Sequence, residues 1–553
     1  MNLSIFLNNS RWTKINRLKR TIFFIGYFDF KGKIVLSASD LEKLLSDKIT
    51  INNFENYLKE ELLPFCNGNF AFIISTEEVI IAVTDYIRNY QILFQKADKE
   101  FLLMDHISET IKKSLLVDNE KCEEFLLSGF VIGNDTVYTN LYSMQPAEIL
   151  FIKKGEYKKV SYFTLDSNPF SKDLLSINEE VIFNRMDKLF LSVFKRMVKS
   201  CPSVRNWIIP LSGGYDSRLI INYLYRLGYK NVICFTYGVG FSDEVKISKA
   251  TAEALGYKWF FVDYTIKKDW VDLHKNGLFD KYIQYSFNGC NLSHVQDLLA
   301  IKVLKDKGII NENDVVVPGH TAFTETESEE ILNLHSENDS VNYVFSKYYN
   351  LIKSKNSTKL KKRLQNLFED ENQTAINFPL FFNWSERQVK FIGNSVRAYE
   401  FFGLDWRMPF WEREIFDFWK MLDYKDRVER KIFIKASKEK LFVKELKDIP
   451  IIDKFNKSSE VNILFIKRII PLRIKSFIAA QMKWSSKVPV GTNEVFTEKG
   501  KNVMEIMQPI HVLPKNIKRY LKPYLLRKPY QMNVNSLSVF YILKTQVIMK
   551  KSL

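Results

Sequence analysis

Cysteine and histidine are scarce in this chain of 553 residues, which has five of the first and six of the second. No two cysteines form a C-x-x-C pair. We therefore expect neither a structural zinc site nor a disulfide scaffold. Isolated thiols of this kind fit a reducing, cytoplasmic setting. The cysteines are Cys66, Cys122, Cys201, Cys234 and Cys290.

Long apolar runs are also absent. No segment offers the roughly 20 uninterrupted apolar residues that a membrane-spanning helix needs. Residues 1–20 alternate apolar and polar side chains and then become basic. They lack the apolar core of roughly 7 to 15 residues and the small-residue cleavage site of a signal peptide. The sequence therefore predicts neither a spanning helix nor a leader.

Acidic residues are nearly missing from the C-terminal end. Residues 461–553 contain 17 Lys and Arg against three acidic residues, so they carry +14 of the net charge of +17. Apolar side chains alternate with the basic ones, as in residues 463–475. Such a tail fits an anionic membrane surface, a lipid-linked or acidic substrate, or nucleic acid. It also fits a helix packed on the body of the protein with a solvated basic face.

The length indicates two to four domains. Residues 1 to about 165 read as short strands with two helices, at Ser39–Leu45 and Asn53–Leu63, and Asp166–Asp173 is the best linker. A helix is expected at Glu179–Lys199, followed by alternating strands and helices. This alternation predicts a doubly wound parallel sheet with a nucleotide at the carboxyl ends of its strands. Residues from 265 onward are mostly helix-like.

The most informative segment is Ser212–Arg218, which follows an apolar strand and opens a helix. Gly213 and Gly214 let backbone amides approach phosphate oxygens, and the helix start offers unpaired N–H groups and a positive dipole end. The hydroxyls of Ser212 and Ser217 add donors. The Lys-Ser/Thr ending of a Walker A loop is absent, which argues against a kinase. What remains is cleavage of ATP between its α- and β-phosphates.

The run Pro210–Arg218 resembles the SGGxDS pyrophosphatase loop of the asparagine synthetase and β-lactam synthetase family. The resemblance implies ATP binding by Leu211, Ser212, Gly213, Gly214, Asp216 and Ser217, and a Mg²⁺ ion held partly by Asp216. After the second strand, Tyr237 and Gly238 match the family's adenine-binding strand end. Glu244, or Asp243 beside it, matches the acidic residue that starts the next helix.

A second phosphate-contacting loop of the family matches Val315–Thr321, with Gly319 at the phosphates and His320 as a candidate to stabilise departing charge. Here the chain departs from the family pattern. The expected acidic pair falls on Phe323 and Thr324, and the nearest carboxylates are Glu325 and Glu327. Either the magnesium ligand has moved to Glu325, or pyrophosphate binding is weakened.

Residues 399–414 resemble the family signature E-x-R-x-P-F-x-D-x-E, with Asp405 in place of its Glu and Glu412 in place of its Asp. A carboxylate and Arg407 beside an acyl adenylate would orient the amine and offset developing charge. Arg407 fits a buried ion pair as well. The family also uses a downstream lysine, for which Lys454, Lys457 and Lys467 are candidates and Lys454 is our choice.

The N-terminal part resembles the class II glutamine amidotransferase domain, an N-terminal-nucleophile hydrolase, through residues 66–72, 84–88 and 129–136. That domain needs a cysteine exposed as its first residue after loss of Met. This chain begins with Met1 and Asn2, so we expect no glutaminase activity. Asn67 and Gly68 match the oxyanion-hole pair but would have no reaction to serve, so the domain would be structural.

These observations predict an αββα N-terminal-nucleophile-like sandwich over residues 1–165, an ATP-pyrophosphatase domain over 175–460, and a basic helical extension over 461–553. The expected activity is an AMP-forming ligase that uses ATP and Mg²⁺ to join a small-molecule or peptide carboxylate to ammonia or an amine, in natural-product or surface-glycan biosynthesis.

Two alternatives stay open at this point, and a third is disfavoured. An amine within the same molecule would make the protein a cyclase, of the β-lactam or lasso-peptide type. The lost acidic pair would suit a non-catalytic ATP-binding scaffold. A tRNA-thiolating enzyme would need a catalytic cysteine pair or an RNA-binding module, and neither is found, so we expect no nucleic-acid partner. A homodimer and a peripheral contact with an anionic membrane through the tail are compatible with the sequence.

Overall fold

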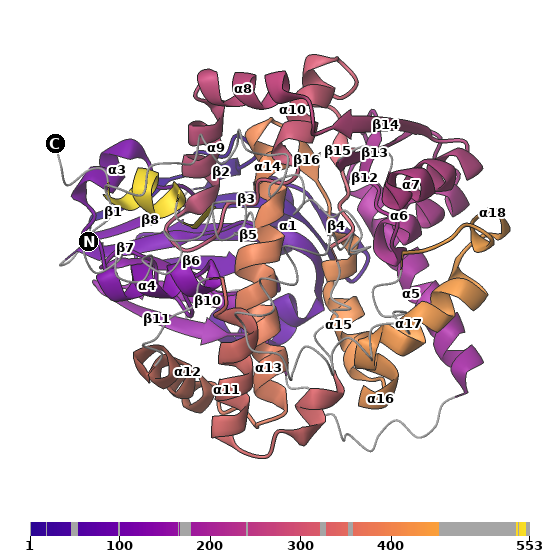
Figure 1. Ribbon diagram of the computed structural model, residues 1–553. Helices are drawn as coiled ribbons and strands as arrows, with labels where there is room; N and C mark the ends of the chain where they lie inside the picture. The colour runs from indigo at the N-terminus through magenta and orange to yellow at the C-terminus, as the bar shows by residue number, and fades with distance from the viewer. Residues whose placement is uncertain are drawn as a thin grey trace, which may run out of the picture.

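The computed structural model describes residues 2–17, 19–45, 54–97, 100–163, 165, 178–238, 242–320, 328–351, 358–452, 538–539 and 541–548. Within these ranges the chain is a mixed α/β structure whose strands form three sheets. Two sheets lie in the N-terminal part, and the third, which is parallel, lies beside them (Figure 1).

The N-terminal part contains a four-stranded and a seven-stranded sheet. The smaller has the order β1-β8-β7-β9, made by Asn2–Phe6, Glu100–Met104, Leu93–Ala97 and Leu141–Ser143. The larger has the order β11-β10-β6-β5-β3-β2, with β4 beside β3. Its strands are Glu156–Ser161 (β11), Glu148–Lys153 (β10), Val79–Thr84 (β6), Cys66–Thr76 (β5), Arg20–Phe30 (β3), Thr13–Arg17 (β2) and Lys33–Val35 (β4).

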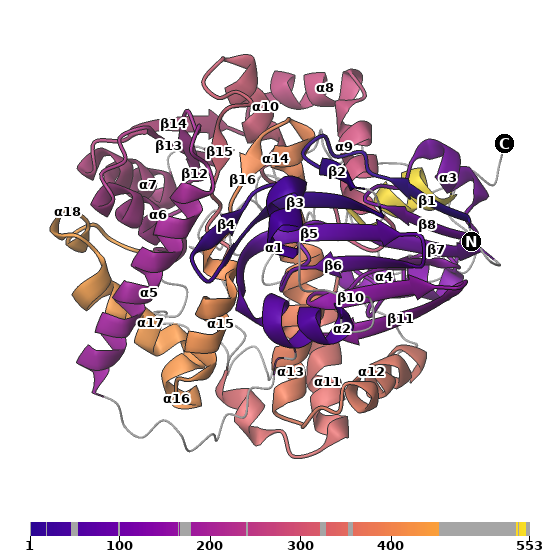
Figure 2. The same ribbon diagram turned by 180° about the vertical axis from the view of Figure 1, so that it is seen from behind.

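Strand β5 shows why these two sheets stack. Successive side chains of a strand point to opposite faces, and in β5 both faces are apolar. Phe70 and Phe72 pack in a cluster with Leu41 of helix α1 (Ala38–Leu45), which covers one face. Ala71 and the residues in phase with it join a second cluster that includes Leu103 of the four-stranded sheet. The order is therefore helix, sheet, sheet (Figure 2).

Several predicted elements of this part are confirmed. The short strands expected in this part are found, β6 among them, and the helix predicted at Ser39–Leu45 is α1. The helix predicted at Asn53–Leu63 is a short α2 (Phe54–Asn56) that continues as a π-helix over Tyr57–Leu62. Helices α3 (Glu109–Ser114) and α4 (Asn119–Ser128) complete the N-terminal part.

The parallel sheet has the strand order β14-β13-β12-β15-β16. Its strands are Trp207–Pro210 (β12), Val232–Gly238 (β13), Lys258–Asp263 (β14), Val315–Val316 (β15) and Asp405–Trp406 (β16). The chain moves outward from β12 to β14, then crosses to β15 on the other side of β12. The strand order therefore reverses between β12 and β15, which is where open α/β sheets bind ligands.

Helices cover both faces of this sheet. The predicted helix Glu179–Lys199 is found as α5 and leads into β12. Helices α6 (Tyr215–Arg226) and α7 (Asp243–Ala254) connect β12 to β13 and β13 to β14. Because such connections are right-handed, these two helices and α10 (Leu298–Asp306), which leads back toward β15, take opposite faces (Figures 1 and 2). The prediction of alternating strands and helices around a parallel sheet is confirmed.

The remaining helices include one long segment that lies between the parallel sheet and the N-terminal sheets (Figure 1). A continuous helical segment made of α13 (Asn377–Phe382), a π-helix (Asn383–Ile392), a 3₁₀ turn (Gly393–Val396) and α14 (Arg397–Phe401) runs between them. The other helices are α8 (Lys267–Lys275), α9 (Leu278–Phe287), α11 (Glu337–Tyr348), α12 (Thr358–Asp370), α15 (Arg413–Lys420), α16 (Tyr424–Arg427), α17 (Lys431–Ala436) and α18 (Lys444–Lys447).

Two short pieces of the basic C-terminal region are described, at 538–539 and 541–548, and they pack on the body. Val539, Ile542 and Leu543 are buried, and the backbone carbonyl of Gln546 accepts a hydrogen bond of 3.2 Å from the Tyr138 hydroxyl. This is the packed arrangement that the sequence left open for the tail, here shown for these pieces alone. The predicted linker Asp166–Asp173 lies outside the described residues. Among the helices that the structure describes, none has the length and apolarity to cross a membrane.

Candidate active site at the carboxyl edge of the parallel sheet

The loop after β12 is anchored to its neighbour β13. The backbone N–H of Leu211 donates to the carbonyl of Phe235 at 2.8 Å, and the Thr236 hydroxyl donates to the carbonyl of Leu211 at 2.7 Å. Thr236 is buried, so this bond is shielded from water. These hydrogen bonds fix the position of Leu211, and the loop with Gly213 and Gly214 therefore begins at the carboxyl edge of the sheet.

The loop leaves the start of α6 available to an anion. Ser217 Oγ accepts a 3.0 Å hydrogen bond from the backbone N–H of Ser212, and the two hydroxyl oxygens lie 3.1 Å apart. Gly214 is the N-cap of α6, and no side chain caps this helix. By contrast, Ser242 caps α7 with its side chain. The α6 amides and the positive dipole end are therefore free of a competing side-chain cap, as phosphate binding requires.

Two glycines allow close approach around this loop. A Cβ on Gly319 would lie 3.0 Å from the backbone nitrogen of Ser217, so the loop after β15 packs directly on the first turn of α6. A Cβ on Gly213 would lie 2.7 Å from Cδ1 of Ile452. The Ile452 backbone N–H also donates to the Gly213 carbonyl at 3.0 Å. The structure thus brings together the predicted residues from Leu211 to Ser217 and Gly319, and it adds Ile452.

Asp216 in the first turn of α6 forms an ion pair with Arg430, whose Nη2 donates to its carboxylate. Arg430 and the preceding Glu429 both have left-handed backbone conformations, with φ of 63° and 53°. Two consecutive non-glycine residues in this region store strain, which is often found at functional sites. The Arg430 guanidinium carbon lies 4.4 Å from the centroid of the Phe433 ring, and its Nε is buried without a hydrogen-bond partner.

Arg430 is a site residue that the sequence did not reveal. No motif surrounds it, and its left-handed conformation cannot be read from residue types such as Glu-Arg-Lys. The only available signal was its basic character. A guanidinium at the start of α6 adds positive charge where the resemblance predicts the phosphates.

The described residues fit the phosphates of ATP, and Asp216 is a carboxylate of the kind that could hold Mg²⁺ beside them. No cluster of three or more metal-ligating side chains is found within the described ranges, which leaves Asp216 as the carboxylate at the loop. Mg²⁺ in nucleotide sites is commonly held by one or two carboxylates together with substrate phosphates and water. Glu325, the other predicted ligand, lies outside the described residues.

Tyr237, predicted at the adenine site, directs its hydroxyl to a buried carboxylate. Its OH donates to Asp297, which accepts a second hydrogen bond from Tyr399. The Tyr237 ring stacks on that of Tyr264, with centroids 4.8 Å apart. The neighbouring Gly238 ends β13 opposite Asp263, and Glu244 lies in the first turn of α7, partly exposed.

His320 follows Gly319 and contacts Ser395 in the 3₁₀ turn Gly393–Val396 of the continuous helical segment. Its Nε2 lies 2.6 Å from the Ser395 hydroxyl oxygen. Burial lowers the pKa of His320, and the charge of Asp297 opposes that shift without cancelling it. A neutral imidazole near the loop Ser212–Ser217, called the phosphate loop below, can accept or donate a proton through a hydrogen bond.

Asp405 and Arg407 lie elsewhere. In the sheet register, Asp405 pairs with Val315, which pairs with Trp207, so Asp405 is level with the first residue of β12. Leu211 is four residues further along, roughly 13 Å at the rise of a strand. The Asp405 carboxylate accepts from Arg407 at 2.8 Å and from Arg11 at 2.7 Å.

The charges of Asp405 and Arg407 compensate each other, as in a structural ion pair. Burial would raise the pKa of Asp405, but the guanidinium groups of Arg407 and Arg11 outweigh it and hold that pKa below its ordinary value. Arg407 also donates to the Ser200 hydroxyl at 2.8 Å and lies over the Tyr27 ring. The structure therefore does not bring Asp405 or Arg407 to the phosphate loop, and a catalytic role for them stays a prediction.

The rest of that signature joins two halves of the molecule. One half is the N-terminal part, with its two sheets, and the other half contains the parallel sheet. Glu412 accepts from the Tyr27 hydroxyl at 2.9 Å and from Arg196 Nη2 at 2.6 Å. The Asn67 amide, matched to an oxyanion hole, donates to Glu414 at 2.9 Å. Gly68 pairs with Phe28 in the β3–β5 ladder. Asn67 and Gly68 thus serve strand pairing and the junction between the halves.

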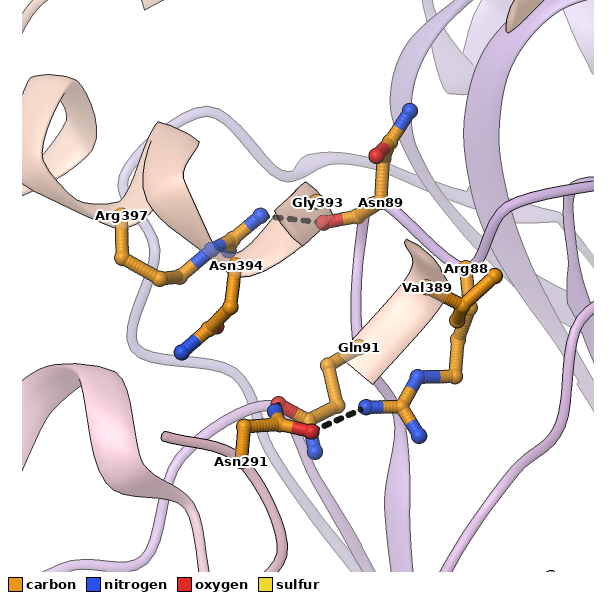
Figure 3. A pocket seen from close by; sticks show the side chains of 8 residues that line it. All are labelled: Arg88, Asn89, Gln91, Asn291, Val389, Gly393, Asn394 and Arg397. Atoms are coloured by element: carbon orange, nitrogen blue, oxygen red, sulfur yellow. Dashed lines mark hydrogen bonds between the residues drawn. The ribbon is translucent and has the colours of Figure 1, made fainter. Parts of the chain in front are cut away.

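A small polar cavity also lies at this junction (Figure 3). It is lined by Arg88, Asn89, Gln91, Asn291, Val389, Gly393, Asn394 and Arg397, and Arg88 donates to Asn291 at 2.9 Å. Its volume of about 10 Å³ is close to the space that a single water molecule needs. The cavity is therefore too small for a substrate.

Three predicted lysines, Lys454, Lys457 and Lys467, lie outside the described residues, as do Phe323, Thr324 and Glu327. Lys454 follows Ile452, which contacts the phosphate loop, by two positions in the sequence.

No family model matches the chain, and no curated protein matches it. Among solved structures, the NH3-dependent NAD synthetase from Campylobacter jejuni is similar with a TM-score of 0.19 and 15% identity, over 28% of this chain and 61% of the synthetase. A structure of the allosteric regulatory enzyme of purine biosynthesis is similar with a TM-score of 0.19 and 10% identity, over 46% of this chain and 62% of that enzyme.

The U34-tRNA thiolase NcsA from Methanococcus maripaludis is similar with a TM-score of 0.20 and 14% identity, over 38% of this chain and 80% of the thiolase. The chain thus spans less than two thirds of the first two proteins. TM-scores near 0.2 decide nothing about fold or activity. The parallel sheet is established by its own strand pairing.

Proposed function

We propose that this protein is an ATP-dependent, AMP-forming ligase that joins a carboxylate to ammonia or an amine. The observation that carries the proposal is the junction of two loops at the point where strand order reverses. There the uncapped start of α6, the close packing of Gly319 on Ser217, and Arg430 form a site suited to a polyphosphate. The family resemblance of Ser212–Ser217 makes ATP the expected polyphosphate.

The chemistry follows from the charges at this site. A substrate carboxylate oxygen would attack the α-phosphorus of ATP, and the bond to the bridging oxygen would break to release pyrophosphate. The first-turn amides of α6 and Arg430 would stabilise the charge that develops on the leaving group. Mg²⁺, when bound, would neutralise phosphate charge next to Asp216. An amine nitrogen would then attack the acyl carbon and displace AMP, giving an amide and losing one proton.

His320 and Lys454 are the proposed groups for the second step. His320 lies directly after Gly319, and its lowered pKa leaves an imidazole able to take a proton from an attacking amine. Lys454 lies two positions after Ile452 in the sequence and would offset charge on the adenylate. Tyr237, Gly238 and Glu244 are proposed to border the adenine, and Glu325 to complete the magnesium site.

The N-terminal part is proposed to be an inactive N-terminal-nucleophile-like sandwich over residues 1–165, followed by an ATP-pyrophosphatase domain over 175–460 and a basic extension over 461–553. The stacked sheets and α1 support the sandwich. Asn67, matched to the oxyanion hole, is bonded to Glu414 at the junction, which supports the inactivity of the sandwich, so the nitrogen would come from free ammonia or an amine.

The proposal is tested by measuring pyrophosphate release from ATP and Mg²⁺ by the purified full chain, across a panel of carboxylates and amines. We expect release that needs one carboxylate and that falls at least about a hundredfold in Asp216→Ala, since that change removes the proposed magnesium ligand. ATP affinity is measured in parallel by calorimetry.

The control is Asp187→Ala, because Asp187 pairs with Arg226 at the far end of α6 and makes no contact with the loop. Its pyrophosphate release should match that of the unaltered protein. Tight ATP binding without release across the whole panel would contradict the ligase and favour a binding scaffold.

A further inference from the structure

Arg218 of α6 is a buried cation whose hydrogen-bond partners are backbone carbonyls. Its Nη1 donates to the carbonyl of Ile449 at 2.8 Å, and its Nη2 donates to the carbonyl of Pro450 at 2.6 Å. The Arg218 side chain is completely buried, and burial lowers its pKa to about 10. Burying a cation is costly when only neutral carbonyls receive it, so the contact indicates a specific role.

The two carbonyls belong to Ile449–Ile452, a segment without helix or strand. Pro450 is exposed, and the three isoleucines are only partly buried. Backbone carbonyls outside helices and sheets need donors from elsewhere, and the planar fork of one guanidinium can serve two of them at once. Arg218 therefore fixes the path of this segment beside α6.

The same segment ends on the phosphate loop. The Ile452 backbone N–H donates to the carbonyl of Gly213 at 3.0 Å. The carbonyl and the N–H of one trans peptide point in opposite directions, so this bond also directs the Gly214 N–H away from Ile452. That N–H donates to the Ser212 hydroxyl oxygen at 3.3 Å. Ile452 thus holds the Gly213–Gly214 peptide in one orientation.

The orientation of this peptide matters for an anion. Without the Ile452 contact the peptide would be free to rotate, because glycine tolerates many backbone conformations. A Gly213 carbonyl that rotated toward the proposed phosphate site would bring partial negative charge to it and repel the phosphates. A loop held in one orientation before binding also loses less entropy when the ligand arrives.

We propose that Arg218 is a positioning residue of the phosphate loop, which acts through Ile449–Ile452 to fix the Gly213–Gly214 peptide and so raises the affinity for a polyphosphate. The role deepens the proposed function and rests on it for the identity of the polyphosphate as ATP. Its own contacts, with Ile449 and Pro450, place Arg218 behind the segment and not on the ligand.

Asn222, one turn further along α6, provides a matched control. Its Nδ2 donates to the carbonyl of Leu441 at 3.0 Å, and its Oδ1 accepts from the backbone N–H of Val443 at 2.8 Å. Like Arg218, Asn222 is completely buried. Replacing either residue therefore removes two hydrogen bonds between α6 and the chain that follows residue 440, but only those of Arg218 lie next to Ile452.

The first test is calorimetric binding of ATP with Mg²⁺ to the full chain and its variants. Arg218→Met should weaken binding at least about tenfold, because the loop is no longer held in one orientation. Arg218→Lys should recover part of this loss, since an ammonium group can donate to both carbonyls. Asn222→Ala should bind ATP as the unaltered protein does, although both Asn222→Ala and Arg218→Met should unfold at a lower temperature.

The second test needs no nucleotide. Hydrogen exchange, measured by mass spectrometry on peptides that contain Ile452, reports whether its N–H is still bonded to Gly213. Arg218→Met should speed this exchange at least about tenfold, and Asn222→Ala should leave it unchanged.

Three results would overturn the positioning role: equal ATP affinity in Arg218→Met and the unaltered protein, an equal loss of affinity in Asn222→Ala, or unchanged exchange at Ile452 in Arg218→Met. Pyrophosphate release is scored separately. Release with an ATP affinity that ignores Arg218 would remove the positioning role and leave the ligase. Arg218-dependent affinity without release would remove the ligase alone, and no binding of ATP by the unaltered protein would remove both.

Discussion

Arg430 and Asp216 are 214 positions apart in the chain, yet their side chains meet at the start of α6. The contact depends on the left-handed turn at Glu429 and Arg430. The ion pair holds Asp216 and Arg430 together beside the proposed phosphate site. We infer that nucleotide binding replaces this pair with two contacts, Asp216 to the metal and Arg430 to phosphate oxygens.

Replacing Arg430 with Met should weaken the binding of ATP with Mg²⁺ at least about tenfold, equivalent to about 1.4 kcal/mol. The loss follows from removing a charge-assisted hydrogen bond to phosphate. Equilibrium binding of ATP to the purified variant measures it. The companion variant Glu429→Gly relieves one left-handed φ and should raise the free energy of unfolding by about 1 kcal/mol with ATP affinity unchanged. Equal affinity in Arg430→Met and the unaltered protein would rule out the phosphate contact.

At the scale of elements, the site is the meeting point of two loops and one helix start. Gly319 follows β15 and Gly213 follows β12, and each glycine faces a different kind of neighbour. The neighbour of Gly319 is the Ser217 backbone, which cannot move without shifting α6. The neighbour of Gly213 is the end of the Ile452 side chain, which can rotate away.

This difference predicts unequal effects of the same substitution. Gly319→Ala should cost about 1–3 kcal/mol of unfolding free energy, because the new Cβ meets backbone, and ATP binding should weaken with it. Gly213→Ala should cost less than about 1 kcal/mol. Urea unfolding with and without ATP measures both variants. A larger loss for Gly213→Ala than for Gly319→Ala would show that the loops do not meet as described.

The sequence predicted those features that depend on the local pattern of residues. Alternating strands and helices, the helix Glu179–Lys199 and the glycine loop depend on neighbours in the chain, and the structure has them in place. The sequence could not predict the contact of Arg430 with Asp216, because that contact arises from long-range packing and a backbone kink. Asp405 belongs to a motif that the sequence did reveal. Its position along the sheet could not be predicted, because that position depends on the pairing of Asp405 with Val315.

At the scale of the whole molecule, the halves are joined by buried polar contacts. Glu412 is fully buried and holds Arg196 and Tyr27 together, whereas Glu414 contacts the same arginine with 39% of its side chain exposed. The apolar cluster that includes Leu103 also extends across both halves. We therefore expect the halves to unfold together.

Glu412→Ala should reduce the free energy of unfolding by about 3–5 kcal/mol, since it removes a fully buried carboxylate and takes that partner from Arg196 and from the buried Tyr27 hydroxyl. The matched variant Glu414→Ala should cost at most about 1 kcal/mol, as is usual for an exposed ion pair. Chemical denaturation followed by tryptophan fluorescence measures both, and a single transition is expected in each. Equal effects of the two variants would mean that the junction does not depend on Glu412.

The polar junction also has a consequence for synthesis on the ribosome. Tyr27 and Asn67 are made early, but their partners Glu412 and Glu414 follow more than 300 positions later. At the usual rate of about 5–20 residues per second, the N-terminal sheets wait for roughly 20–75 s before these partners emerge. During that time the amide and hydroxyl groups of the unfinished face can bind water, whereas an apolar face would attract other nascent chains. The polar groups of this junction can therefore stay hydrated until translation supplies their partners.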